Sequence, residues 1–120
     1  MWRWLFVVIY AGVIWTVSAI PGSALPGVAV SDKLIHAAEF GGLAYLFCRA
    51  FWAQMPTRPR YCIMAMSVLA TIACGVLDEI HQLSVPQRTA SVGDAIADGL
   101  GVCLAVWLWW WAGARWPWLR

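Results

Sequence analysis

The sequence predicts an all-α, polytopic membrane protein, in which a bundle of four transmembrane helices forms one integral membrane domain over residues 1–120. Composition is the first reason. Of the 120 residues, 62% are hydrophobic and only 12% are charged, whereas a soluble domain carries about 25% charged residues. The second reason is that four apolar stretches reach the roughly 20 residues that a helix needs to cross a bilayer. The segments between them are too short to form a separate soluble domain.

The expected helices cover about residues 3–20, 33–54, 61–83 and 92–113. Segments with proline mark the breaks between them, at 21–26, 56–59 and Pro86. Small residues recur every fourth position on the fourth stretch, at Gly93, Ala97, Gly101 and Ala105, and pairs such as Ala37 and Gly41 do so on the second. Small residues let membrane helices approach closely, so we expect a compact bundle.

The distribution of basic residues predicts the orientation. Four spans put both termini on one side, which also holds Arg3, Arg49, Arg58, Arg60, Arg115 and Arg120, while the other side holds Lys33 and Arg88. Cytoplasmic loops carry an excess of Lys and Arg, so the termini are predicted to face the cytoplasm. Nine of the ten tryptophans map to the same side as an aromatic belt, with Trp15 as the exception. The expected location is the inner (cytoplasmic) membrane, crossed several times.

The first stretch has an alternative interpretation as a signal peptide, because a basic residue precedes the apolar run and small residues, Ser18 and Ala19, follow it. We expect it to be a retained transmembrane helix.

The four cysteines show neither paired spacing nor zinc-like spacing. We interpret them as reduced thiols that pack as small hydrophobic residues. The net charge of +2 and the lack of a basic aromatic patch argue against nucleic acid as a partner.

The polar residues gather at the end opposite the arginines. All six acidic residues and both histidines of the chain map there: Asp32, His36, Glu39, Asp78, Glu79, His81, Asp94 and Asp98. Ionisable groups inside a membrane span are costly, so such a group of residues is a functional-site hypothesis by default. We therefore expect a polar site that faces the extracytoplasmic side.

On the second stretch, spacings of four and three place Asp32, His36 and Glu39 on one helix face. Structural alternatives exist for each. Asp32 is also a candidate N-cap, and Lys33 a topology charge that extends to the interface. His36 and Glu39 are also candidates for a hydrogen bond to each other or to a neighbouring helix.

On the third stretch, Glu79 and Gln82 share a face. Glu79 lies seven residues before Pro86, about 10 Å inside the helix end. A carboxylate at that depth needs a partner, and the structural alternative is an ion pair with Arg88 or Lys33. His81 has an alternative position at the membrane interface.

In the third loop, Arg88 is suited to an anionic ligand because of its planar guanidinium group. Ser91 and Asp94 match the S-x-x-D start of a helix, so a capping box is the structural alternative for Asp94. Asp98 lies one turn deeper on the same face, where capping does not explain it.

The order of these motifs resembles the VanZ-like membrane protein family. The matching pattern is D-K-x-x-H from Asp32 to His36, E-x-x-Q from Glu79 to Gln82, then P-x-R ending at Arg88, S-x-x-D ending at Asp94, and a final glycine at Gly101. The resemblance covers about residues 10–110. It implies a small multispan bacterial membrane protein of a family named for teicoplanin resistance, and no reaction comes with it. The family often has Asn at the position of Asp98, so this chain adds an acidic group there.

Our leading hypothesis is a site that binds a lipid or envelope-precursor head group at the outer leaflet, with chemical modification of that group left open. We assign acid–base roles to His36 and Glu79. Binding roles go to Asp32, Lys33, Glu39, Gln82, Arg88, Asp94 and Asp98. No cofactor is identified, and a divalent metal held by imidazole and carboxylate groups is an alternative without a strong motif. A proton- or ion-coupled transporter and a structural partner of an envelope protein are the alternative functions. The oligomeric state stays open.

Overall fold

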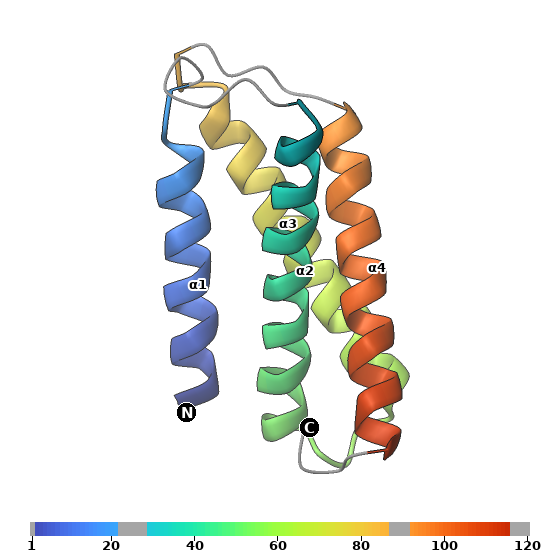
Figure 1. Ribbon diagram of the computed structural model, residues 1–120. Helices are drawn as coiled ribbons and strands as arrows, with labels where there is room; N and C mark the ends of the chain where they lie inside the picture. Colours follow the sequence, from blue (N-terminus) through green and yellow to red (C-terminus); the bar gives the residue numbers. More distant parts are fainter. Residues whose placement is uncertain (1, 22–28, 87–91, 116–120) are drawn as a thin grey trace.

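The computed structural model describes residues 2–21, 29–86 and 92–115 (Figure 1). It consists of four α-helices and contains no strand within these ranges. The helices are α1 (Trp2–Ser18), α2 (Ala29–Gln54), α3 (Arg60–Gln82) and α4 (Val92–Arg115). The expected boundaries agree to within two residues at most ends, and the largest difference is that α2 begins at Ala29 rather than near residue 33.

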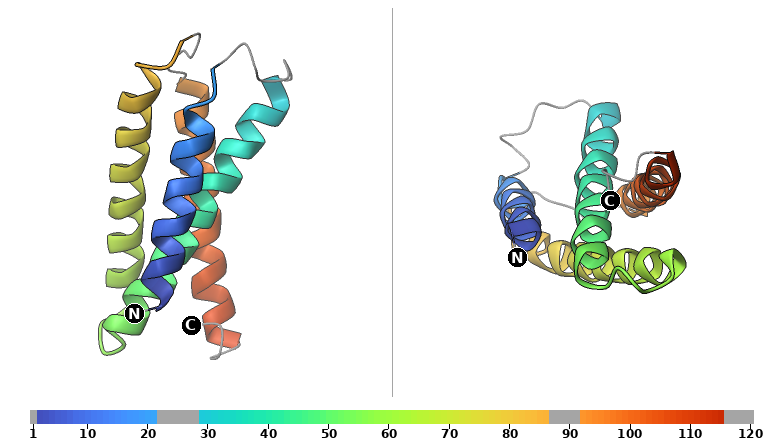
Figure 2. Two further views of the ribbon diagram at one scale, coloured as in Figure 1. Left: turned by 90° about the vertical axis from the view of Figure 1, so that its left-hand side faces the viewer. Right: turned by 90° about the horizontal axis from the view of Figure 1, so that it is seen from below.

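The bundle is elongated, with extents of 46 × 26 × 19 Å. Its long dimension matches the roughly 40–45 Å of a bilayer with its head-group regions. Helix α2 contacts each of the other three helices, whereas α1 and α4 do not contact each other along their described lengths. Seen from below, α2 stands between α1 and α4, and α3 runs along the remaining side (Figure 2). Helix α2 is therefore the element that places the others.

Glycines allow α2 to approach its neighbours closely. A Cβ atom at Gly101 of α4 would collide with the carbonyl group of Ala37, and one at Gly41 would lie 2.9 Å from the carbonyl oxygen of Gly101. A Cβ atom at Gly42 would likewise collide with the hydroxyl of Tyr10 on α1. The predicted packing through small residues is confirmed at Gly41 and Gly101, where a larger side chain would meet the backbone of the neighbouring helix.

The buried core lies below the polar end, between α2 and its neighbours. Its most buried members include Leu43, Ala44, Cys48 and Ile63, each at most 1% exposed. At the arginine end, the guanidinium group of Arg60 donates hydrogen bonds to backbone carbonyls of the last turns of α4, at 3.3 and 3.0 Å. A cation at the C-terminal end of a helix is favourable to the helix dipole.

Two helices, α3 and α4, are long and apolar enough to cross a membrane, so the prediction of four such helices is only partly right. Helix α1 has 17 residues, because it ends at Ser18, and is shorter than the roughly 20 residues of a typical span. Helix α2 has 26 residues, but Lys33, Glu39 and Arg49 lower its hydropathy.

The exposed surface of the bundle supports a membrane location. Only 22% of the apolar window of α3, and the same share of α4, is buried inside the structure. A core helix of a soluble protein would be mostly buried. Instead, large apolar side chains such as Leu69, Ile96 and Leu100 are between 59% and 67% exposed. Apolar surface of this extent fits contact with lipid rather than with water.

Candidate functional site

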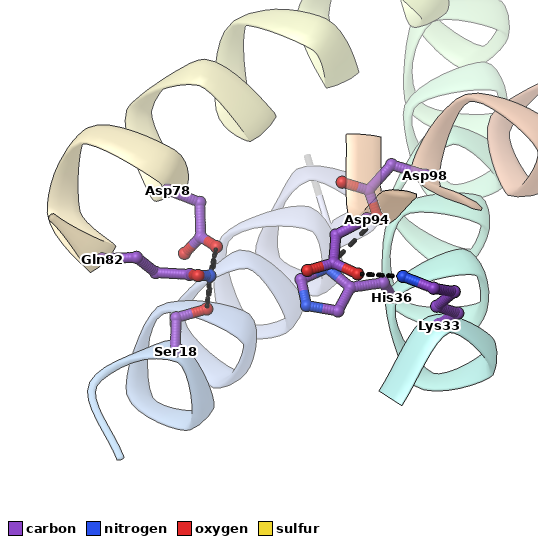
Figure 3. A network of polar contacts seen from close by, with 7 residues as sticks. All are labelled: Ser18, Lys33, His36, Asp78, Gln82, Asp94 and Asp98. Atoms are coloured by element: carbon purple, nitrogen blue, oxygen red, sulfur yellow. Dashed lines mark hydrogen bonds and ion pairs between the residues drawn. The ribbon is translucent and has the colours of Figure 1, made fainter. Parts of the chain in front are cut away.

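The polar residues meet at the end of the bundle where α1 and α3 finish and α2 and α4 begin. They form two separate groups, each of which joins one pair of helices (Figure 3). We call Lys33, His36, Asp94 and Asp98 the α2–α4 cluster, and Ser18, Asp78 and Gln82 the α1–α3 cluster. The sequence predicted one site at this end, and the structure divides it into two.

The α2–α4 cluster consists of one ion pair and one histidine–carboxylate contact between the helices. The Lys33 Nζ atom lies 3.0 Å from the Asp94 Oδ1 atom, as a hydrogen-bonded ion pair. One turn further along, the His36 Nδ1 atom lies 3.3 Å from the Asp98 Oδ1 atom. Because α2 and α4 run parallel at close distance, residues three and four apart on each helix form successive contacts between them.

The two contacts differ in their exposure to solvent. The side chains of Lys33 and Asp94 are 49% and 17% exposed, whereas those of His36 and Asp98 are 9% and 24% exposed. The cluster therefore extends from the solvent-exposed ammonium group of Lys33 at the bundle end to the nearly buried imidazole of His36 below it.

The glycine contact lies directly beneath this cluster. Gly101 follows Asp98 by three residues on α4, and Ala37, whose carbonyl it meets, follows His36 on α2. The absence of a side chain at Gly101 thus brings the two backbones close enough for the short Asp98 side chain to reach the imidazole.

The α1–α3 cluster is a buried hydrogen-bond network. The Asp78 Oδ2 atom accepts a hydrogen bond from the Ser18 hydroxyl at 2.8 Å and another from the Gln82 amide at 2.6 Å. All three residues are at most 6% exposed. The network satisfies the two donors and the Asp78 Oδ2 atom, which would otherwise be costly to bury. The Asp78 Oδ1 atom is buried and has no hydrogen-bond partner within the described residues.

An aromatic stack extends this second contact between α1 and α3. The rings of Trp15 and His81 are 4.2 Å apart and nearly parallel, at 18°. Sequence reasoning treated Trp15 only as an exception to the tryptophan belt, and the structural alternative for His81 at the interface did not include this partner. Ser18 was also missed as a site residue. Its only signal was that it is the last polar residue before α1 ends.

Three other predicted site residues are placed only in part. Asp32 lies within α2, which begins at Ala29, so its interpretation as the N-cap is wrong; its side chain is not described. Glu39 and Glu79 are half buried on α2 and α3. The Glu79 carboxylate has no ion pair or hydrogen bond within the described ranges, so its proposed pairing with Lys33 is wrong.

The loop before α4 holds further predicted residues. Arg88 and Ser91 lie outside the described residues, so their roles stay predictions. Asp94 lies in the first turn of α4, where an acidic group is favourable to the helix dipole. Its side chain pairs with Lys33 across the helices, which gives it a structural role beyond the start of its own helix.

The divalent-metal alternative gains no support from the arrangement of ligands. Among the described residues, no three His, Cys, Asp or Glu side chains lie close enough together to hold a metal ion. The four cysteines are free thiols, and Cys48 is buried in the core.

The four helices, their exposed apolar faces and the charged groups at one end define a small α-helical membrane protein with a polar site near one end of the bundle. The chain belongs to the VanZ/LLP1 family, whose model matches residues 3–113, nearly the whole sequence. The resemblance inferred from the sequence motifs is therefore confirmed. No curated protein and no solved structure matches the chain significantly.

The motif residues have different positions in the bundle. Lys33, His36 and Asp94 form contacts of the α2–α4 cluster. Gln82 belongs to the α1–α3 cluster. Gly101 is the point of closest approach between α2 and α4. The motif thus combines residues that carry charge with residues that hold the helices together.

Proposed function

We propose that this protein binds a lipid-anchored polar head group, either of a phospholipid or of a lipid-linked envelope precursor, at the α2–α4 cluster. The observation that carries the proposal is the pair of stacked ionic contacts between Lys33 and Asp94 and between His36 and Asp98. We further propose that this end of the bundle faces the extracytoplasmic side, because the arginines are concentrated at the other end.

The gradient of exposure within the cluster supports a ligand that enters from the membrane surface. Lys33 is 49% exposed and has the flexible, cationic side chain that suits a phosphate or carboxylate. His36 lies deeper and is positioned to exchange a hydrogen bond with a bound group. A head group that displaces Asp94 from Lys33 would thus contact the imidazole next. Arg88, in the adjoining loop, is proposed as a second cation for the same anion.

The core below the cluster favours binding over passage of ions through the bundle. Beneath His36 the contacts are apolar, with Phe40, Leu43 and Phe47 each no more than 8% exposed. The buried hydroxyls of Ser67 and Thr71 donate to carbonyls of their own helix, at 2.8 Å in both cases. Polar groups that would relay an ion are therefore already occupied or absent along this described part of the core.

Native mass spectrometry of the protein purified from bacterial membranes tests the proposal. We expect a lipid to remain bound to the natural protein and to be lost, at least tenfold in occupancy, in the His36→Gln variant. The control is His81→Gln, which changes the other histidine at the same end but touches the α1–α3 contact. It should keep the lipid.

Three results would contradict the proposal. One is a protein without any bound lipid, another is the same number of bound lipids in His36→Gln as in the natural protein, and the third is equal loss in His36→Gln and His81→Gln. Arg88→Ala adds a test of the loop, because it should weaken binding without changing the helical content measured by circular dichroism.

The His36–Asp98 contact also favours a second candidate function, acid–base modification of the bound head group. A carboxylate that orients an imidazole is a common arrangement for proton transfer. Glu79 is the predicted second group of such a pair. Incubation with the lipid recovered from the protein should then give a product of changed mass, and neither His36→Gln nor Glu79→Gln should form it. An unchanged lipid with the natural protein would leave binding as the sole function.

A further inference from the structure

A second site lies at the opposite end of the bundle. A partly open pocket of about 280 Å³ lies between α1 and α2, lined by Trp2, Arg3, Phe6, Leu46 and Arg49. It belongs to the arginine-rich end, which the distribution of charges predicts to be cytoplasmic. None of its residues belongs to the α2–α4 cluster.

Two arginines from different helices line this pocket. The Arg3 guanidinium group donates a hydrogen bond from Nη1 to the backbone carbonyl of Arg49, at 3.0 Å, so it is held against α2. The Nε atom of Arg49 is buried and has no hydrogen-bond partner in the part of the chain that the structure describes. A buried guanidinium nitrogen without a partner is costly, and an acceptor in the pocket would remove that cost.

No Asp or Glu side chain is available to this pair of cations. All six Asp and Glu residues lie toward the other end of the bundle. The nearest one along α2 is Glu39, ten residues before Arg49, or about 15 Å along the helix. Two guanidinium groups at one pocket repel each other unless an anion lies between them. An anion from outside the protein would relieve this repulsion.

The remaining lining is apolar. Trp2, Phe6 and Leu46 complete the pocket, and the exposed face of α1 continues from it through Leu5, Val8 and Ile9, which are 54% to 66% exposed. An apolar surface next to a pair of cations fits a molecule that has both an acyl chain and an anionic head. Guanidinium groups bind phosphate through paired hydrogen bonds, and basic pockets between membrane helices suit acidic phospholipids.

We propose that this pocket binds an anionic phospholipid of the leaflet at the arginine end. Its phosphodiester group would lie between Arg3 and Arg49, where it would accept a hydrogen bond from the Nε–H group of Arg49. Its glycerol and upper acyl chain would lie against Trp2, Phe6 and the exposed apolar face of α1. The site is independent of the α2–α4 cluster, since the two lie at opposite ends of α2.

Native mass spectrometry of the delipidated protein, titrated with defined probes, tests the proposal. We expect one phosphatidylglycerol to bind at least tenfold more tightly than phosphatidylcholine with the same acyl chains, because two cations disfavour the choline group. Inorganic phosphate should neither bind measurably nor compete at equal concentration. Arg49→Gln should reduce the affinity for phosphatidylglycerol at least tenfold.

The matched control is Arg58→Gln, which removes a cation from the same end of the bundle but outside the pocket. It should leave the affinity within twofold. Arg49→Lys keeps the charge without the planar fork, so it should fall between the natural protein and Arg49→Gln, and it tests the site in a variant whose charge is unchanged. Equal binding of the two lipids, equal loss in Arg49→Gln and Arg58→Gln, or equal competition by inorganic phosphate would each overturn the proposal.

Discussion

The α2–α4 cluster and the α1–α3 cluster lie at the same end of the bundle but differ in charge, exposure and the helix contact beneath them. The first has formal charges on both helices, and its cation is half exposed. The second is almost fully buried and uses hydrogen bonds to a single carboxylate. The first rests on a glycine contact between backbones, whereas an aromatic stack adjoins the second.

This difference separates residues suited to a ligand from residues suited to holding helices. In the α1–α3 cluster the Ser18 hydroxyl and the Gln82 amide already have a partner in the Asp78 Oδ2 atom, so these donors have little to offer a ligand. An exposed ion pair has a small net stability, so a ligand can replace one partner at little cost. We therefore expect changes in the α1–α3 cluster to affect stability and changes in the α2–α4 cluster to affect binding.

The largest loss of stability is expected where the two backbones meet. In Gly101→Ala the new methyl group would collide with the carbonyl of Ala37, and overpacking of this kind costs about 3 kcal/mol. Thermal unfolding in detergent, followed by circular dichroism, measures the effect. Gly99→Ala is the control, because nothing lies within 4 Å of a Cβ atom at Gly99. Equal melting temperatures for the two variants would show that the close approach is not required.

Breaking the buried network should have the next largest effect. Asp78→Ala would leave the Ser18 hydroxyl and the Gln82 amide buried without their shared acceptor, at a cost of about 2 kcal/mol. Asp78→Asn keeps an acceptor oxygen and should lose less. Thermal unfolding gives the stability, and lipid occupancy in native mass spectrometry should stay unchanged in both variants. A loss of bound lipid with intact stability would reverse the assignment of the two clusters.

These expectations show what the sequence could and could not predict. The helix positions followed from apolar length and from proline breaks, and the close helix contact followed from the spacing of Gly101, Gly41 and Ala37. The number of spanning helices was overestimated. Helix α1 ends too early to reach the length of a membrane span, and polar residues lower the hydropathy of α2. Both helices nevertheless pack within the same bundle.

The pairing of polar residues was less accessible from the sequence. Spacing along one helix shows which residues share a face, but not which face of another helix they meet. The structural alternatives weighed were therefore a cap for Asp94 and a topology charge for Lys33, and neither included the contact between the two residues. Ser18 and Trp15 gave no signal, since a serine or a tryptophan near a helix end is common at membrane interfaces.

The deeper contact of the α2–α4 cluster, between His36 and Asp98, should affect binding more than stability. His36→Gln removes the imidazole that faces Asp98 and should lower lipid occupancy at least tenfold, with a change in the free energy of unfolding of about 1 kcal/mol or less. Asp98→Asn tests the same contact from α4 and keeps the side-chain shape. Unfolding of either variant at the temperature of binding would assign the contact a mainly structural role.

The outer contact of the same cluster, between Lys33 and Asp94, should have a still smaller effect on stability. Lys33 is half exposed in its pair with Asp94, and such pairs contribute about 0.2–1 kcal/mol. Lys33→Gln should therefore unfold within about 0.5 kcal/mol of the natural protein, while the affinity for an anionic head group falls several-fold. Raising the salt concentration should weaken binding by the natural protein more than by the variant, because salt screens the exposed charge. Equal salt dependence in both proteins would exclude Lys33 as a contact of the head group.

The smallest expected quantity is the coupling between the two clusters. They join different helix pairs, and no contact links their members in Figure 3, so the losses in Asp98→Asn and Asp78→Asn should add to within about 0.5 kcal/mol in the double variant. Within the α1–α3 cluster, Ser18→Ala and Gln82→Leu act on the same oxygen of Asp78 and should be coupled more strongly. Both cycles are measured by unfolding in detergent. Strong coupling between the clusters would mean that α2 transmits a change in one contact to the other, and the division into a binding site and a structural contact would no longer hold.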